Sequence, residues 1–293
     1  MKRSQSDQDT HGRAKDKAST DRGSVQSLIR ALSLLEILAE DDDGYRLVDL
    51  ALRTGLSTST AHRLLTTLEQ KRFVQFDHQT SRWYVGAQCF TVGTAFGRRR
   101  NLGEMAHAAM RRVRDATGET VNLGLADQGT VLFVSQVESR EQIRAISRPG
   151  DRAPLVCTAL GQAILSGMTE AEVAEIVRKH GLPRLTPNSI ARPSELYKVL
   201  GEVRCAGFAV DDEQNSLGLR CVAATIYNES SMPMAAVSIA GPTLRVTPLR
   251  IPELGQQIMA AAREITRAIG GRPPATPVSN ATMRRSLTLL SRG

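Results

Sequence analysis

The sequence holds few of the residues that build metal sites or disulfide frameworks. Among 293 residues there are four cysteines and five histidines, and no CxxC pair. Structural zinc sites and disulfide-rich scaffolds need paired or regularly spaced ligands. The sequence therefore predicts no metal, no cofactor and no catalytic residue, and the scattered cysteines are interpreted as reduced thiols. These are Cys89, Cys157, Cys205 and Cys221.

Long apolar segments are also missing. No run is long enough to span a bilayer, and the N-terminus has no signal-peptide core. We therefore expect a cytoplasmic protein with no membrane partner. The net charge of +8 suits an anionic partner, although the basic excess is spread along the chain rather than gathered in one stripe. The length is sufficient for two domains that each bury their own core.

Residues 55–69 predict a turn and a helix with two chemically opposed faces. Ala61, Leu64, Leu65 and Leu68 recur at i, i+3, i+4 and i+7, so this stripe is expected to pack inward. Hydroxyls, an imidazole and a guanidinium occupy the other face, and such groups suit the DNA major groove. With Ser57 as its N-cap, the segment is interpreted as a helix-turn-helix recognition helix.

The flanking residues predict the rest of a winged helix-turn-helix domain. A helix capped by Ser24 is expected first, and a short helix around residues 47–51 second. The inward stripe expected for the first helix is Leu28, Ala31, Leu32, Leu35, Leu38 and Ala39. Extended runs at 73–76 and 82–85 predict a hairpin whose basic residues meet phosphates. The predicted DNA contacts are Ser57, Thr58, Ser59, Thr60, His62, Arg63, Thr66, Lys71, Arg72 and Arg82.

Two alternatives to this interpretation stay open. One is an ordinary three-helix domain whose charged face is only solvated. The other is an architectural protein that binds DNA without sequence preference, which would show no operator preference over bulk DNA at matched salt.

The sequence divides into five segments. Residues 1–22 are expected to be a disordered arm, 23–85 the DNA-binding domain, 86–100 a linker helix, 101–271 a second domain and 272–293 a flexible tail. In the second domain, strands are expected near 121–125, 130–136, 143–147, 208–210, 219–227 and 235–241. Helices are expected near 101–117, 158–166, 170–179, 194–205 and 252–269. This order predicts an α+β domain on a largely antiparallel sheet.

Several motifs in this order resemble the isocitrate lyase regulator (IclR) family, over residues 25–271. They are Val25–Leu28, Arg30–Leu32, Gly55–Ser57, His62–Leu65, Pro154–Leu155, Thr158–Gly161, Gly207–Glu213, Gly218–Cys221 and Ser238–Pro242. The resemblance implies a winged-helix domain and a GAF-like effector-binding domain with flanking helices. It implies a non-enzymatic regulator, a repressor or activator, that binds a double-stranded DNA operator as a homodimer or homotetramer. Residues 207–242 resemble the glyoxylate-shunt repressor branch, whose effectors are small 2-oxo acids such as glyoxylate and pyruvate.

The effector site can be placed by chemistry and by resemblance. A small carboxylate needs converging donors, and the start of a helix supplies unpaired amides. Residues 154–161 enter a helix, so the amides of Ala159 and Leu160 are candidates, and the resemblance implies the same two. The resemblance further implies the side chains of Asp211, Cys221 and Ser238, and we expect Leu219 and Ile143 to add apolar wall. We expect Asp211 to accept a hydrogen bond from a hydroxyl of hydrated glyoxylate.

Each of these side chains has a plainer interpretation. Cys221 suits a small buried position on a strand, Ser238 can bond within its sheet, and Asp211 can cap a turn before Gly218. An enzyme with Cys221 as nucleophile would need an adjacent base, and no histidine is near it in sequence.

Three positions depart from the family pattern. Gln162 stands where Lys is usual, Gln214 where Glu is usual, and Ala240 where glyoxylate-responsive relatives have Ser. The loss of one neutral hydrogen bond changes binding by about 0.5–1.5 kcal/mol. An aromatic or sugar-derived acid therefore remains an alternative effector.

Overall fold

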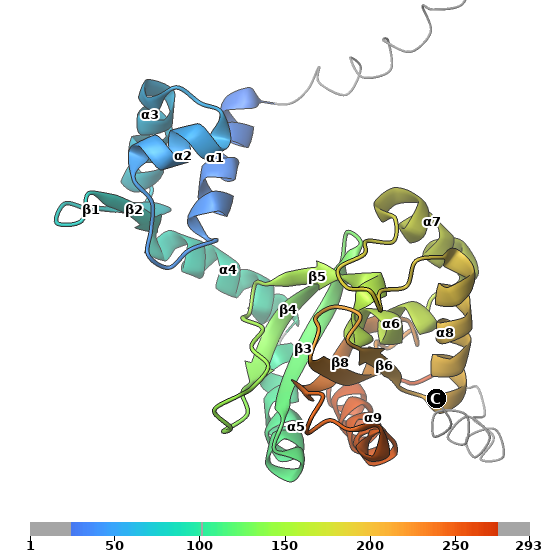
Figure 1. The fold of residues 1–293 in the computed structure, drawn as a ribbon. Helices are drawn as coiled ribbons and strands as arrows, with labels where there is room; N and C mark the ends of the chain where they lie inside the picture. Colours follow the sequence, from blue (N-terminus) through green and yellow to red (C-terminus); the bar gives the residue numbers. More distant parts are fainter. Residues whose placement is uncertain (1–24, 101, 275–293) are drawn as a thin grey trace, which may run out of the picture. The chain divides into compact units, whose positions relative to one another are not determined.

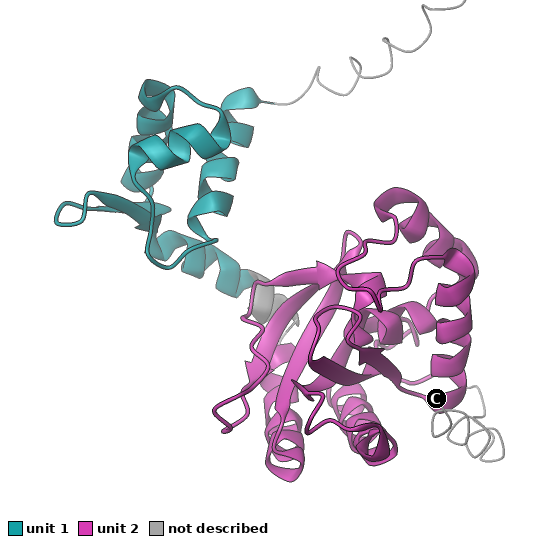
Figure 2. Ribbon diagram, viewed as in Figure 1, with its two compact units in different colours: residues 1–99 teal, residues 100–293 magenta. Residues whose placement is uncertain are grey.

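The computed structural model describes residues 25–100 and 102–274, with the backbone alone for 96–100. The chain divides into two compact units, residues 1–99 and 100–293 (Figure 2). The expected arm at 1–22, the expected cap Ser24 and residues 275–293 of the expected tail lie outside the described residues.

Within residues 25–100, the first unit contains three helices, a hairpin and a fourth helix. Its elements are α1 Gln26–Leu38, α2 Leu47–Thr54, α3 Thr58–Gln70, β1 Val74–Asp77, β2 Arg82–Val85 and α4 Ala87–Arg100 (Figure 1). β1 and β2 pair antiparallel. The helix-turn-helix and its wing are as the sequence predicts.

The core of this unit corrects the face expected for α1. Leu38 of the predicted stripe is buried, together with Leu34, which the stripe did not include. Leu28 and Leu32, two other residues of the stripe, are 57% and 49% exposed. α1 is rich in leucine on more than one side, so periodicity alone does not determine which face is buried. The contacts of α1 with α2 and α3 determine it.

The wing is held to the loop between α1 and α2. Tyr45 and Trp83 form a β-bridge, and Arg82 Nη1 donates to the carbonyl oxygens of Asp43 and Gly44 at 3.1 and 2.8 Å. These bonds fix the hairpin relative to the helices.

The second unit is built on a six-stranded sheet of order β5-β4-β3-β8-β7-β6 in which every neighbouring pair is antiparallel. The strands are β3 Thr120–Asp127, β4 Thr130–Val137, β5 Arg152–Pro154, β6 Ala209–Asp212, β7 Leu219–Tyr227 and β8 Pro233–Pro242. The predicted antiparallel α+β domain is confirmed.

Helices cover both faces of this sheet (Figure 1). α5 Leu102–Thr117 and α9 Ile251–Ala268 pack on one face around Val121, Leu123 and Val237. The other face carries the short turn η1 Leu155–Cys157, then α6 Ala159–Ser166, α7 Glu170–His180 and α8 Pro193–Ala206. The short turn η2 Pro248–Arg250 leads into α9. Alternate residues of each central strand therefore face two different cores.

The strand expected at 143–147 is wrong. These residues lie in a loop, and Ile143 is 75% exposed, so the structure gives it no place in an apolar wall. The sheet position beside β4 is taken by β5, where Pro154 pairs with Thr130. None of the helices in the described residues is long and apolar enough to cross a membrane.

Candidate nucleic-acid interface and candidate effector site

The start of α3 is built by a turn and a cap. Gly55 adopts a φ of 65°, which a residue with a side chain seldom accepts, and this ends α2 and redirects the chain. The Ser57 hydroxyl accepts a hydrogen bond from the Thr60 amide at 3.2 Å, as an N-cap should. Ala61 and Leu65 are buried and Leu64 and Leu68 pack beside them, so the predicted inward stripe is confirmed.

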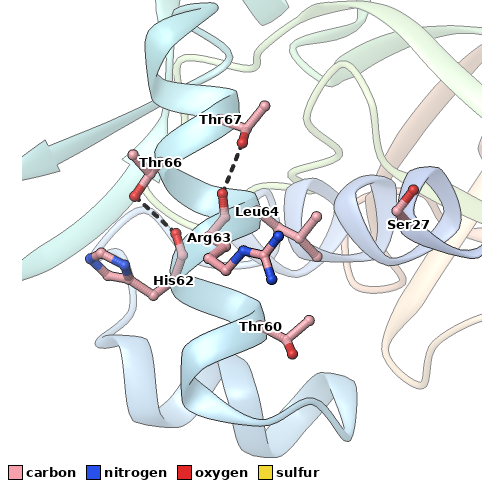
Figure 3. A pocket seen from close by; sticks show the side chains of 7 residues that line it. All are labelled: Ser27, Thr60, His62, Arg63, Leu64, Thr66 and Thr67. Atoms are coloured by element: carbon pink, nitrogen blue, oxygen red, sulfur yellow. Dashed lines mark hydrogen bonds between the residues drawn. The ribbon is translucent and has the colours of Figure 1, made fainter.

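The opposite face of α3 borders an open groove. Its lining residues are Ser27, Thr60, His62, Arg63, Leu64, Thr66 and Thr67 (Figure 3). His62 and Arg63 are both exposed, and no element of the described part of the first unit covers them. Ser27 comes from α1, and the sequence prediction missed it because only tertiary packing brings α1 beside α3.

The polar side chains of this face differ in whether they already make hydrogen bonds within the protein. Among the described residues, neither the His62 ring nor the Arg63 guanidinium has a hydrogen-bond or ion-pair partner. The threonine hydroxyls are engaged, because Thr66 Oγ1 donates to the His62 carbonyl and Thr67 Oγ1 to the Arg63 carbonyl, each at 2.9 Å. The free donors of the face are therefore the imidazole and the guanidinium.

The other predicted DNA contacts lie around this helix. Ser57, Thr58 and Ser59 are exposed at its start, and Lys71 and Arg72 are exposed directly after its end. Arg82 lies on β2, where its Nη1 is engaged by backbone carbonyls as described above. A guanidinium has five N–H donors, so this arrangement leaves donors for a phosphate.

Replacing Ser57 with alanine should lower the free energy of unfolding of the first unit by about 1 kcal/mol, because the Thr60 amide would lose its capping acceptor. Hydrogen exchange at the amides of α3 in the full chain measures the loss. Thr58→Ala is the control, since Thr58 is exposed and begins the same helix. Equal stability of the two variants would show that the cap contributes nothing.

In the second unit, neighbouring strands bring the predicted effector residues onto one face. Asp211 on β6 pairs with Cys221 on β7, which pairs with Ala240 on β8. Ser238 lies two residues before Ala240 and therefore faces the same side. Cys221 packs in the core that lies under α6. The structure thus brings three predicted side chains together beneath the helix that carries the predicted amides.

The first turn of α6 presents the two predicted amides. Thr158 Oγ1 accepts from the Gly161 amide at 3.1 Å and caps the helix. The amides of Ala159 and Leu160 precede it and have no acceptor within the helix, as is general for a first turn. Both residues are buried, at 1% and 3% exposure. A carboxylate placed here would meet unpaired N–H groups and the positive end of the helix dipole.

Asp211 is the buried carboxyl of this cluster. It is 2% exposed, and its Oδ1 accepts from the amides of Gln214 and Asn215 at 2.7 and 3.3 Å. Burial raises the pKa of Asp211 to about 7, although these two hydrogen bonds act in the opposite direction. The carboxyl caps a turn, as the plainer interpretation expected, but its Oδ2 has no partner among the described residues.

The two cysteines near Asp211 are poor nucleophiles. Burial raises the pKa of Cys157 to about 11, and it raises the pKa of Cys221 well above the ordinary thiol value, with Asp211 adding to both shifts. The thiolate is the reactive form of cysteine. This environment favours protonated thiols and argues against an enzyme built on Cys221.

Two further polar residues complete the cluster. Ser238 and Asn122 are each 2% exposed and directly paired between β8 and β3. The Asn122 Oδ1 accepts from Gln136 Nε2 at 2.9 Å, whereas the Ser238 hydroxyl has no partner among the described residues. Sequence reasoning missed Asn122, although a polar residue between Val121 and Leu123 was a usable signal. Leu219 is half-buried and lies two residues before Cys221, on the same side of β7.

A glutamine pair connects α6 to the turn that holds Asp211. Gln162 is fully buried, and its Nε2 donates to the Val156 carbonyl and to Gln214 Oε1. Gln162 Oε1 accepts no hydrogen bond from any residue that the structure describes. The two departures from the family pattern at 162 and 214 therefore form one neutral contact.

Comparison with known proteins identifies both units. Residues 27–78 match the IclR helix-turn-helix domain, and residues 95–267 match the C-terminal domain of the bacterial transcriptional regulator IclR. The chain belongs to the IclR family. The acetate operon repressor of Salmonella typhimurium is 40% identical over 251 residues, which cover 85% of this chain and 92% of that protein. Transcriptional repressor IclR of Escherichia coli is 38% identical with the same coverage of the two chains, 85% and 92%.

The family also has solved structures with this fold. The crystal structure of Thermotoga maritima IclR is 31% identical, with a TM-score of 0.70, and the match covers 83% of this chain and 98% of that one. The matched families and relatives are DNA-binding transcriptional regulators and not enzymes. This confirms the predicted class and excludes the Cys221 enzyme alternative.

Proposed function

We propose that this protein is a transcriptional repressor that binds its operator through α3 and the wing and is controlled by a small 2-oxo acid, such as glyoxylate or pyruvate. The observation that supports DNA binding is the exposed face of α3, where the side-chain donors of His62 and Arg63 have no partner within residues 25–100 and 102–274. Lys71, Arg72 and Arg82 then contact phosphates and set the register. A homodimer would place two such helices in successive major grooves of a palindromic site.

The effector half is supported by the buried polar cluster under α6. The acid's carboxylate accepts from the amides of Ala159 and Leu160, and Ser238 donates its free hydroxyl. A hydroxyl of hydrated glyoxylate donates to Asp211. Cys221 and Leu219 form the less polar wall. The name of one relative, the acetate operon repressor, favours an effector from the metabolism of short carboxylic acids.

The effector acts only if it has different affinities for a conformation that binds the operator and one that does not. The difference would be passed through the linker of residues 86–100. Allosteric coupling of about 1–3 kcal/mol is typical and would change operator affinity by about 5- to 150-fold.

The test is a gel-shift of the full chain on DNA upstream of its own gene, titrated with glyoxylate, pyruvate, 4-hydroxybenzoate and gluconate. We expect a specific complex that either glyoxylate or pyruvate dissociates and the other two acids leave intact. Ser238→Ala is the matched effector variant, which should bind the same DNA and need more acid for release. If only 4-hydroxybenzoate or only gluconate dissociates the complex, that acid and not a 2-oxo acid is the class of effector. If the protein binds this DNA no more tightly than bulk DNA at matched salt, the upstream region contains no specific operator.

Effector affinity should fall as the pH rises from about 6 to about 8. The folded-state pKa of Asp211 is raised to about 7, so the carboxyl is neutral below that pH and anionic above it. The anionic form repels the ligand carboxylate. Its neighbours Cys157 and Cys221 stay protonated in this range because their pKa values are raised. The adjacent Asp212 is largely exposed and paired with Arg220 at 2.6 Å. If only the neutral form binds, the loss is about tenfold.

Isothermal calorimetry with glyoxylate, in buffers of different ionisation enthalpy, measures both the affinity and the proton taken up. Asp211→Asn keeps a carbonyl oxygen for the Gln214 amide but does not titrate, so its affinity should not change over this range. Affinity of the wild-type protein that rises with pH would mean that the anionic carboxylate is the form that binds.

A further inference from the structure

Two threonines of α3 turn their hydroxyl groups toward the helix and their methyl groups outward. The hydroxyls of Thr66 and Thr67 donate to carbonyls one turn earlier, those of His62 and Arg63. Figure 3 shows both methyl carbons on the side away from these bonds. Both residues line the groove of the exposed face. Although the sequence suggests hydroxyl donors at these positions, the structure presents apolar groups.

These methyl groups accompany two free nitrogen donors. Thr67 follows Arg63 by four residues and Thr66 follows His62 by four, so each donor has a methyl one turn further along the same face. Four residues of helix span about 6 Å, close to two base-pair steps of about 3.4 Å. In the major groove an arginine pairs with guanine, and a threonine methyl contacts the 5-methyl group of thymine.

We propose that α3 recognises thymine through the methyl groups of Thr66 and Thr67, within about two base pairs of a guanine contacted by Arg63. This inference rests on the proposed operator binding and specifies what the operator must contain. The 5-methyl group of thymine is the only apolar group that a base pair presents in the major groove. A methyl that faces this groove therefore discriminates thymine from cytosine, whereas an outward hydroxyl would accept several bases.

The probe is a set of duplexes selected by the full chain from a random-sequence pool. In the selected consensus, each thymine is replaced in turn by deoxyuridine, which removes only the 5-methyl group. We expect at least one position per half-site, near a guanine, where the affinity of the wild-type protein falls about fourfold. This corresponds to about 0.8 kcal/mol, the value of one buried methyl-sized group.

Matched variants of the protein locate the contact. Thr66→Ser and Thr67→Ser each remove one methyl and keep the hydroxyl, whereas Thr66→Val and Thr67→Val keep the methyl and remove the hydroxyl. At least one serine variant should bind the thymine duplex about fourfold more weakly and lose its preference for thymine over uracil. The valine variants should keep that preference. Thermal unfolding of each variant verifies that α3 is folded.

The outcomes separate the inference from the function on which it rests. If the wild-type protein binds uracil-substituted duplexes as tightly as thymine duplexes at every position, the methyl contact does not exist. If the valine variants lose affinity and the serine variants do not, the hydroxyls contact the DNA instead. If the wild-type protein selects no consensus from the pool at matched salt, operator binding itself fails.

Discussion

Replacing Gly161 with alanine should destabilise the second unit by about 3 kcal/mol or more. A Cβ at this position would lie 2.0 Å from the Leu155 carbonyl oxygen and 2.5 Å from the Leu155 Cα. Both are backbone atoms, so no side chain can move aside to make room. The η1 turn and the first turn of α6 would have to separate.

This close approach also builds the proposed effector site. The turn 155–157 folds back over Gly161, and the chain then enters α6 at Thr158 with the amides of Ala159 and Leu160 unpaired. Moving the turn would move these amides relative to Asp211 and Ser238. We therefore expect Gly161→Ala to lower both the melting temperature, by about 6–12 °C, and the response to the effector.

Gly201→Ala is the matched control. Gly201 also lies within a helix, α8, but a Cβ there would meet no atom within 4 Å. Because alanine is the better helix former, this variant should gain about 1 kcal/mol. Differential scanning calorimetry of the two variants measures the contrast. A Gly161→Ala protein that melts with the wild-type protein would show that η1 and α6 separate without cost.

The elements that the sequence predicts well are those with a strong local signal. Ser57, Gly55 and the stripe from Ala61 to Leu68 define α3 by capping, turn geometry and period, and none of these depends on distant residues. The β7 strand at 219–227 is also predicted correctly, because its nine residues are mostly apolar and include Val222, Thr225 and Ile226, which favour strands. The secondary structure of such segments is determined by the residues within them.

The sequence predictions fail where contacts between elements that are distant in sequence determine the structure. Leu28 and Leu32 continue an apolar pattern, yet they are exposed, and the packing of α2 and α3 buries Leu34, which the predicted stripe did not include. The segment 143–147 alternates like a strand, but β5 occupies the place beside β4. In the candidate effector site, register places Asn122 opposite Ser238, and no spacing along the chain reveals this pairing. The orientation of the Thr66 hydroxyl is likewise invisible in sequence.

Replacing Arg63 with alanine should weaken operator binding by about 1–3 kcal/mol, which is about 5- to 150-fold, and relax the preference for guanine at one position of each half-site. The guanidinium is exposed and has no partner among the described residues, so the free protein loses no contact on substitution. The free energy of unfolding should therefore stay within about 0.5 kcal/mol of the wild-type value. The substitution should therefore lower the affinity for DNA without lowering the stability of the fold.

Lys71→Ala provides the contrast that separates base contacts from phosphate contacts. Lys71 is exposed just after α3, where it meets the DNA backbone in the proposed complex. Its loss should weaken binding to all sequences alike and make the dependence of log affinity on log salt shallower by about 1. Arg63→Ala should instead change the ranking of single-base operator variants, measured by fluorescence anisotropy at several salt concentrations. If both variants weaken every sequence equally, α3 only tracks the phosphates, and the recognition of bases must come from another part of the chain.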